Sequence, residues 1–297
     1  MAPEPYKSCR ICPRNCGADR TVGPAGFCRS GSIPHVAHYG AHHWEEPPIS
    51  GTRGSGTVFF SGCNLRCAFC QNREISRCEI GEPAGPARLT EIFLELAESC
   101  HNINLVTPSH FLPSLIEAIG LAKERGLKVP VVYNTGGYEK VSAIRQLEGL
   151  VDIYLPDLKY RSSRLSKALS NAPDYFENAT AAILEMHRQV GHLQTDDSGI
   201  ARRGLIIRHL VLPGETDDSI EVLEWIRDNI GKYANVSIMS QYTPEFIDDR
   251  GSVYNRKLTA DEYAMVVGRA QDIGLVNSMT QELDSSSPDY VPDFNRI

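Results

Sequence analysis

Three closely spaced cysteines, Cys63, Cys67 and Cys70, are the side chains of this sequence best suited to metal chemistry. They follow the apolar run 57–60, so we expect them on a loop at the end of a strand. Three thiolates can hold a metal centre and leave one coordination position open, whereas four would close it. An iron–sulfur cluster, a zinc ion and three structural cysteines without metal are the alternatives. Cys78 is the nearest fourth ligand for zinc, but it lies beyond a stretch typical of a helix start, so the spacing favours the cluster.

A second group of cysteines stands near the start of the chain, in a segment rich in Gly and Pro and poor in apolar residues. Its members are Cys9, Cys12, Cys16 and Cys28. Such a segment cannot form a core of its own, and a metal held by four thiolates would supply the missing folding energy. Zinc and an auxiliary iron–sulfur cluster both suit this ligand set, and no metal at all is the third alternative. The segment would then serve as an electron relay, as a peptide-docking module or only as a stapled arm.

Four histidines lie within residues 35–43, just before the acidic pair Glu45 and Glu46. Pro47 and Pro48 indicate an extended loop here. Histidines on loops are more often solvated or hydrogen-bonded than bound to metal, so we do not assign these as ligands. We expect the acidic pair to shape the entrance for the substrate.

Composition and charge argue against several classes of protein. The chain has 297 residues, of which 41% are hydrophobic and 23% charged, so a sizeable core can form. Its net charge of −7 argues against a nucleic-acid-binding surface, which needs clustered basic residues. No apolar run approaches the length of a membrane span, and the first residues carry no signal-peptide pattern. Nine cysteines in such a chain predict metal chemistry in the reducing cytoplasm rather than disulfides.

Apolar extended runs alternate with segments of helical period along most of the chain. The expected strands are 57–60, 103–106, 129–133, 151–155, 205–212 and 236–240. The expected helices are 89–100, 113–123, 138–147, 174–190 and 216–230. This alternation predicts an α/β fold with a parallel sheet, right-handed crossovers and a site at the carboxyl ends of the strands. We expect three parts: a cysteine-rich arm (1–55), a core domain (56–245) and a C-terminal helix and tail (246–297).

Several short motifs, taken together, resemble one known family. They are Cys-x-x-Cys-Pro-Arg-x-Cys-Gly at 9–17, Glu-Glu-Pro-Pro-Ile-Ser-Gly at 45–51, the run 54–67 that leads into the cysteine loop, Asp-Leu-Lys at 157–159 and Arg-His-Leu-Val-Leu-Pro-Gly at 208–214. With the spacing of three and then two residues between the cysteines of the loop, they resemble the radical S-adenosylmethionine (SAM) superfamily. Within it, the chain is similar to uncharacterised proteins related to pyruvate formate-lyase activating enzyme. The resemblance implies a (βα)6 partial TIM barrel of the radical SAM type with a cysteine-rich N-terminal extension.

The resemblance also implies the cofactors and the residues around them. Cys63, Cys67 and Cys70 would hold a [4Fe-4S] cluster, and its open iron would take the amino and carboxylate groups of SAM. An electron from the cluster would then break a carbon–sulfur bond and release a 5′-deoxyadenosyl radical. Phe69 would pack beside the adenine. The other residues expected around the cofactor are Gln71, Asn72, Thr107, Ser109, Asn134, Asp157, Lys159, Arg208 and His209.

One element of the activating enzymes is missing. They usually carry Gly-Gly-Glu at the end of the second strand, where it accepts from the amino group of SAM. This chain has Val-Thr-Pro-Ser-His at 106–110 instead. The carbonyl of Thr107 or the hydroxyl of Ser109 would have to supply the acceptors.

The function that follows from this resemblance is hydrogen abstraction by the 5′-deoxyadenosyl radical. Because the related activating enzymes form a glycyl radical on a large partner, we expect a protein or peptide substrate and a flavodoxin- or ferredoxin-type electron donor. The N-terminal arm and the tail 284–295 are candidate docking segments. Two alternatives are radical modification of a small molecule or cofactor precursor, and a non-catalytic iron–sulfur or zinc accessory protein.

Overall fold

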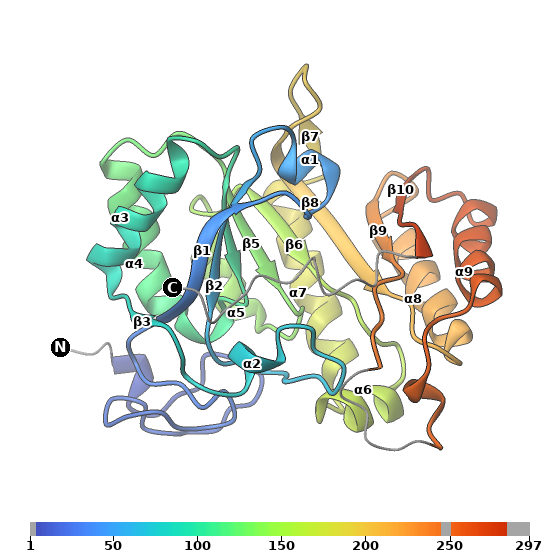
Figure 1. The fold of residues 1–297 in the computed structure, drawn as a ribbon, viewed down its shortest axis with the longest axis horizontal. Coiled ribbons are helices and arrows are strands. Elements are labelled where there is room, and N and C mark those ends of the chain that lie inside the picture. Colours follow the sequence, from blue (N-terminus) through green and yellow to red (C-terminus); the bar gives the residue numbers. More distant parts are fainter. Residues whose placement is uncertain (1–3, 245–250, 284–297) are drawn as a thin grey trace.

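A mixed sheet of ten strands forms the centre of the fold (Figure 1). The computed structural model describes residues 4–244 and 251–283. The parallel strands in these ranges are β2 (Ser55–Phe60), β4 (Ile103–Val106), β5 (Val131–Thr135), β6 (Ile153–Pro156), β8 (Ala201–Leu210), β9 (Asn235–Met239) and β10 (Asn277–Thr280). β1 (His35–His42) and β3 (Glu82–Pro83) extend one edge in antiparallel pairing, and β7 (Gln194–Thr195) pairs with β8. The order of strands runs from β10 to β3 without closing, so the barrel is open on one side.

Helices connect the parallel strands and bury their apolar faces against the sheet. The longer ones are α3 (Pro86–Ala97), α4 (Leu112–Glu124), α6 (Ser163–Ser170), α7 (Tyr175–Val190), α8 (Thr216–Asn229) and α9 (Ala260–Asp272). Short turns of helix are α1 (Pro47–Ser50), α2 (Arg73–Ser76) and α5 (Val141–Ile144), with 3-10 turns η1 (Glu4–Tyr6), η2 (Ser109–Phe111), η3 (Arg145–Leu147) and η4 (Val253–Asn255). In α3, the spacing of Leu89, Ile92, Phe93 and Leu96 puts all four on one buried face. The predicted partial barrel of parallel strands and outer helices is confirmed.

The C-terminal part adds more to the sheet than its sequence pattern indicates. Besides the expected helix, residues 246–297 contain β10, which pairs in parallel with β9. This strand was not predicted because its sequence, Asn-Ser-Met-Thr, lacks the apolar run that marks the other parallel strands. The tail 284–297 lies outside the described residues.

The histidine-rich segment is a strand, not the loop that its sequence predicts. His35, His38 and His42 belong to β1, which pairs with β2 from Val36↔Phe60 to His42↔Ser55. Strand pairing with an apolar neighbour outweighs the weak pattern of the segment itself. The two prolines after it begin α1, because a proline at the first helical position loses no hydrogen bond.

The short helix α1 closes the inner side of the open barrel. Its Ile49 has no exposed surface and packs with Val132, Ile153, Leu155 and Ile206, which lie on β5, β6 and β8. These four residues alternate with the ones that face the outer helices, so they belong to the inner face of the sheet. We call Ile49 the plug residue, because it fills the barrel at the amino-terminal half of the strands.

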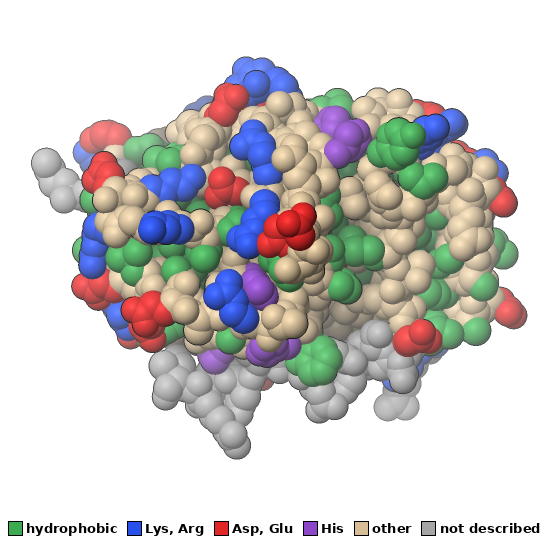
Figure 2. All heavy atoms as spheres, turned by 90° about the horizontal axis from the view of Figure 1, so that it is seen from above, with side chains coloured by type: hydrophobic (Ala, Val, Ile, Leu, Met, Phe, Trp, Pro, Cys, Tyr) green, Lys and Arg blue, Asp and Glu red, His purple; other side chains and the backbone are tan. Residues whose placement is uncertain are grey.

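In the described ranges, no helix is long and apolar enough to cross a membrane. Figure 2 shows the molecule from the side of α1, where basic and acidic side chains are interspersed.

The plug gives a direct prediction about stability. Replacing Ile49 with Ala should lower the free energy of unfolding by about 2–5 kcal/mol, because it leaves a cavity in a packed core. Urea unfolding followed by circular dichroism measures the change. Ile33→Ala is the control, since Ile33 is 53% exposed, and it should change stability by no more than about 0.5 kcal/mol. Equal, small effects of the two changes would contradict the packing role of Ile49.

Candidate functional site

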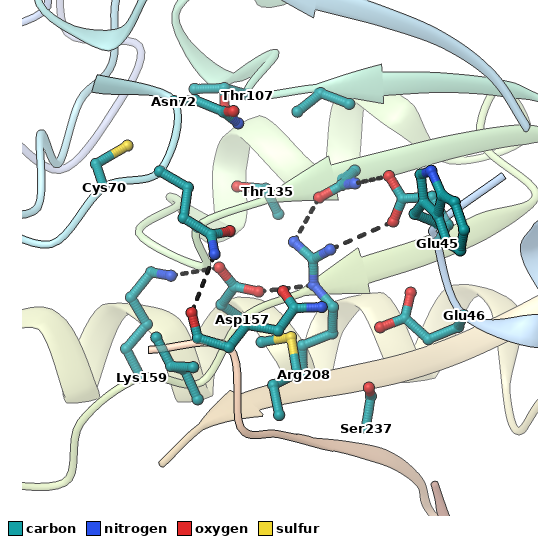
Figure 3. Close-up of a pocket in the computed structure, with 18 of the residues that line it drawn as sticks. Glu45, Glu46, Cys70, Asn72, Thr107, Thr135, Asp157, Lys159, Arg208 and Ser237 are labelled. Atoms are coloured by element: carbon teal, nitrogen blue, oxygen red, sulfur yellow. Dashed lines mark hydrogen bonds and ion pairs between the residues drawn. The ribbon is translucent and has the colours of Figure 1, made fainter. Parts of the chain in front are cut away.

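A cavity of about 290 Å³ opens where the carboxyl ends of the parallel strands meet the loop of Cys63, Cys67 and Cys70. The following residues expected around the cofactor line it: Cys63, Cys67, Phe69, Cys70, Gln71, Asn72, Thr107, Asn134, Asp157, Lys159 and Arg208. Figure 3 shows several of them converging from different strands. Ligand sites at this end of parallel strands are the rule for such sheets.

The cysteine loop is held by hydrogen bonds to sulfur. Cys63 Sγ accepts from the backbone N–H of Leu65 at 3.3 Å and from that of Arg66 at 3.5 Å. Cys67 Sγ accepts from the hydroxyl of Ser170 at 3.0 Å. Arg66 adopts a positive φ of 53°, which turns the loop so that these N–H groups face the sulfur. Donors aimed at sulfur stabilise thiolates and tune the clusters that they hold.

The thiols need positive charge to ionise. Burial, and after it the neighbouring Cys67, raises the pKa of Cys63 to about 12, and burial also raises the pKa of Cys70. The nearby Lys159 ammonium opposes that shift at Cys70. The cationic core of an iron–sulfur cluster would supply the missing charge, so one buried and two half-buried thiols on one cavity wall fit such a group. In the described ranges no three Cys, His, Asp or Glu side chains surround a position for a single metal ion.

A partly buried polar network crosses the middle of the cavity. Arg208 Nε donates to Asp157 Oδ1 at 2.8 Å, and Arg208 Nη2 donates to Asn134 Oδ1 at 2.7 Å. Arg208 Nη1 lies 3.5 Å from Glu45 Oε2. Lys159 pairs with the other oxygen of Asp157. The sequence places Asp157 and Lys159 on the same side of the chain, and the structure brings both into the cavity, not onto the surface.

The charges of this network set the direction of each pKa. Burial alone would raise the pKa of Asp157, but the cations of Arg208 and Lys159 outweigh it and lower the value. Burial alone would lower the pKa of Lys159, but the Asp157 carboxylate outweighs it and raises the value. Both groups are therefore charged at neutral pH.

Glu45 and Glu46 line the cavity instead of standing at an exposed entrance. Glu45 Oε1 accepts from Asn104 at 3.0 Å and from Asn134 at 3.3 Å, so it is tied to β4 and β5. Glu46 is 8% exposed. Both carboxylates come from the turn before the plug residue, which carries them onto the inner face of the sheet.

Thr107 stands at the end of β4 with a φ of 60°, which is rare for a β-branched residue. Its N–H donates to the carbonyl of Asn134 at 2.9 Å, which holds this backbone in place. Strain of this kind persists where the surrounding structure fixes it, and it is common at functional sites. Ser109, expected beside Thr107 in the cofactor pocket, lies instead behind the cavity wall, because η2 turns the chain inward.

The sequence did not predict a role for Glu139, a buried carboxylate beside Ser109. Glu139 is 1% exposed and accepts from the hydroxyls of Ser109, Thr135 and Tyr133. Thr135 itself lines the cavity. The strand-end turn Gly136–Gly137 just before Glu139 is the signal that could have found it. The chain lacks the carboxylate that the activating enzymes carry after the strand corresponding to β4. It has one after β5 instead, Glu139, and the hydroxyl of Thr135 stands between this carboxylate and the cavity.

His209 does not line the cavity, although its neighbour Arg208 does. Its Nδ1 lies 2.7 Å from the carbonyl of Leu158, and the side chain is 1% exposed. Successive residues of a strand point to opposite faces, so Arg208 and His209 cannot both face the cavity. His209 therefore packs between β8 and the chain that follows β6.

The N-terminal arm packs directly on the cysteine loop. Arg14 Nε donates to the carbonyl of Asn64 at 2.8 Å, and Arg14 Nη2 donates to that of Ser170 at 2.9 Å. Three of the arm's cysteines, Cys9, Cys12 and Cys28, are buried, and Cys16 is exposed. All four are free thiols, as are the others of the nine.

Comparison with known proteins identifies the family of the chain. A family model described as the radical SAM superfamily matches residues 57–226, more than half of the chain. The chain therefore belongs to the radical SAM superfamily. It is an enzyme of that superfamily, with a [4Fe-4S] cluster and SAM as its cofactors, as its sequence predicts.

The individual proteins that this chain resembles are only distantly similar in sequence. The chain is 29% identical over 280 residues to the uncharacterized protein MJ0674 of Methanocaldococcus jannaschii, an alignment that covers 91% of this chain and 76% of that protein. SuiB of Streptococcus suis, solved with S-adenosylmethionine, matches 76% of this chain with a TM-score of 0.51 and 16% identity. The match covers 50% of the SuiB chain, and such a likeness shows the fold alone. A domain of a pyruvate-formate lyase-activating enzyme from Bacteroides vulgatus matches 58% of this chain and 91% of its own, with a TM-score of 0.39 and 12% identity.

Glu139 gives a prediction about pH. Burial raises the pKa of Glu139 to about 7, although hydrogen bonds from Ser109, Thr135 and Tyr133 lower it in part. The folded protein keeps a proton that the unfolded chain releases above pH 4.5. The stability contributed is therefore complete below that pH and is lost as the pH rises to about 7.

The test compares wild type with Glu139→Gln, which keeps an acceptor oxygen but cannot titrate. The stability of wild type relative to this variant should fall by up to roughly 3 kcal/mol across this pH window. Urea unfolding at several pH values measures the difference. Glu117→Gln, on the exposed side of α4, is the matched control and should show no such trend. A pH-independent difference between wild type and Glu139→Gln would contradict the assignment.

Proposed function

We propose that this radical SAM enzyme abstracts a hydrogen atom from a protein or peptide substrate. The observation that carries the proposal is the open barrel: in the described ranges β10 and β3 end the sheet without pairing to each other, so the strands do not enclose the cavity on that side. A segment of polypeptide needs such a wide approach, whereas a small metabolite is better served by an enclosed pocket. The cysteine-rich arm lies beside the cysteine loop and offers a docking surface for a large partner.

The bound cluster and SAM supply the chemistry, which is reductive cleavage of SAM to methionine and a 5′-deoxyadenosyl radical. The chain supplies ligands, orientation and exclusion of water. We assign Cys63, Cys67 and Cys70 as the cluster ligands. Asp157 can accept from ribose hydroxyls, and Lys159 can meet a carboxylate. The remaining residues proposed to contact SAM are Phe69, Gln71, Asn72, Thr107, Asn134 and Arg208.

The test of this function uses anaerobic, cluster-loaded enzyme with reductant, SAM and a purified glycyl-radical enzyme of the pyruvate formate-lyase type. Wild type should form 5′-deoxyadenosine, and electron paramagnetic resonance should show a glycyl doublet on the partner. Cys67→Ala should give neither, because two thiolates do not hold the cluster. Cys78→Ala is the matched control, since Cys78 is exposed and does not line the cavity.

The outcomes separate the alternatives. If the 5′-deoxyadenosyl radical takes a hydrogen atom from a small metabolite and no partner protein shows a glycyl doublet, the substrate is a small molecule and not a peptide. Full SAM cleavage by Cys67→Ala would contradict the ligand assignment itself. Absence of cleavage by wild type would leave the accessory-protein alternative.

We further propose that the N-terminal arm holds a second metal through Cys9, Cys12, Cys16 and Cys28. Four thiolates can hold zinc or a second cluster, and either centre carries a net negative charge. The four side chains do not already surround a position for a single ion in the described ranges, so zinc would require them to move together. Arg20 supports such a centre, because its fully buried guanidinium lies 3.6 Å from Cys9 Sγ. In the described ranges Arg20 forms no ion pair with an acidic side chain, and its other donors meet backbone carbonyls.

Metal analysis of the triple variant Cys63→Ala, Cys67→Ala, Cys70→Ala tests the arm. If the arm holds a second cubane, wild type should contain about eight irons and the variant about four. If it holds zinc, the variant should keep about one zinc and lose its iron. A triple variant with neither metal would show that the four cysteines of the arm are ordinary thiols.

A further inference from the structure

Glu46 has a buried oxygen that nothing in the described ranges satisfies. Its Oε2 is shielded from solvent and has no hydrogen-bond partner there, and the residue lines the cavity. In Figure 3 the Glu46 carboxylate points into the cavity, toward Arg208, and Ser237 is the next labelled residue. Buried polar atoms are almost always paired, so an unpaired acceptor in a binding cavity indicates a donor that is brought by a ligand.

The neighbouring charges show what kind of donor fits. Three carboxylates face this cavity, from Glu45, Glu46 and Asp157, against the two cations of Lys159 and Arg208. Both cations are already used: Lys159 pairs with Asp157, and Arg208 pairs with Asp157 and Glu45. In the described ranges Glu46 is therefore the carboxylate of this group without an ion pair. Burial raises the pKa of Glu46, which works against its ionised form. A positively charged donor bound to its unpaired oxygen would favour the carboxylate and complete the balance of charge.

Other groups near Glu46 do not supply that charge. Arg208 acts on Glu46 only as a nearby charge, since its ion pairs go to the other two carboxylates. Burial lowers the pKa of His42, which also lines the cavity, so this side chain is neutral at neutral pH. Ser237 offers one hydroxyl, which is a neutral donor.

The position of Glu46 also places it away from the cluster. The cysteine loop follows the carboxyl end of β2, whereas Glu46 directly precedes α1, whose plug residue fills the amino-terminal half of the barrel. In Figure 3, Cys70 and Glu46 stand on opposite sides of the Asp157–Arg208 pair. Glu46 thus belongs to the floor of the cavity, where a group that reaches past the cofactors would end.

We infer that Glu46 is a specificity residue that binds a cationic nitrogen group of the substrate, an ammonium or a guanidinium. This inference rests on the proposed function, and it names the chemistry of the substrate at the floor of the same cavity. In a peptide substrate the group would be the side chain of a lysine or arginine near the reacting residue. A charge-assisted hydrogen bond to Glu46 Oε2 would then hold it.

The experiment uses four probes on one scaffold: n-butylammonium, n-butylguanidinium, n-butanol and butyrate. Each is titrated at equal ionic strength into anaerobic cluster-loaded enzyme with SAM and without reductant, and ligand-observed NMR gives the dissociation constants. The two cations should bind at least about tenfold more tightly than the alcohol and the anion, because only they pair with the unpaired carboxylate. Equal binding of all four probes would overturn the inference.

Three variants separate a specific contact from a general effect of charge. Glu46→Gln should remove the preference for cations by about tenfold, and Glu46→Asp should retain part of it because the charge remains. Glu95→Gln removes one exposed charge on α3 and should leave the preference unchanged. Cluster absorbance and the melting temperature show that each variant is folded and loaded. A folded Glu46→Gln protein that keeps the full preference would also overturn the inference.

A separate measurement of SAM cleavage by wild type distinguishes a wrong role for Glu46 from a wrong proposed function. If wild type forms 5′-deoxyadenosine but binds the four probes equally, only the role of Glu46 is wrong. If wild type forms none, the proposed function fails whatever the probes show.

Discussion

The partly buried guanidinium of Arg208 joins the two ends of the cavity. It lies between Asp157, which faces the cysteine loop through Lys159, and Glu45, which belongs to the floor. Each of these charges would be costly to bury alone, and each becomes tolerable because its neighbour has the opposite sign. Residues that are 163 positions apart in the chain are thereby held in contact. The two ends of the cavity consequently depend on the same guanidinium, through one ion pair with Asp157 and another with Glu45.

The arm and the cysteine loop are coupled in a similar way. Arg14 binds the carbonyls of Asn64 and Ser170, and the hydroxyl of Ser170 donates to Cys67. A movement of the arm would therefore shift a donor that acts directly on a thiol of the loop. This coupling gives the cysteine-rich segment an influence on the thiols of the cysteine loop that does not require it to carry electrons.

The sequence was sufficient wherever a signal is local. The apolar run of β4 predicted that strand at 103–106, and the position of the three thiols after the run 57–60 predicted a cysteine loop at the end of β2. It was insufficient where partners are distant in the chain. The strand β1 was missed because pairing with β2, and not its own pattern, makes it a strand.

The cofactor pocket shows the same division. Eleven of the expected residues line the cavity because they lie near the carboxyl ends of strands or in the loops that follow, which the sequence reveals. Alternation along β8 already separates Arg208 from His209 and could have corrected that expectation. The inward turn of Ser109 and the burial of Glu139 behind it could not be predicted, because both depend on how η2 and β5 pack together.

The plug residue also constrains the order of folding. Ile49 belongs to the N-terminal part of the chain, yet its partners on β5, β6 and β8 follow it by 83 to 157 residues. During synthesis α1 leaves the ribosome long before the surface that receives it exists. The sheet must assemble at least as far as β8 before the floor can form, and contacts of such long sequence separation slow folding. The floor of the cavity is therefore completed late, and so is the cysteine loop, whose Cys67 receives its hydrogen bond from Ser170, 103 residues further along the chain.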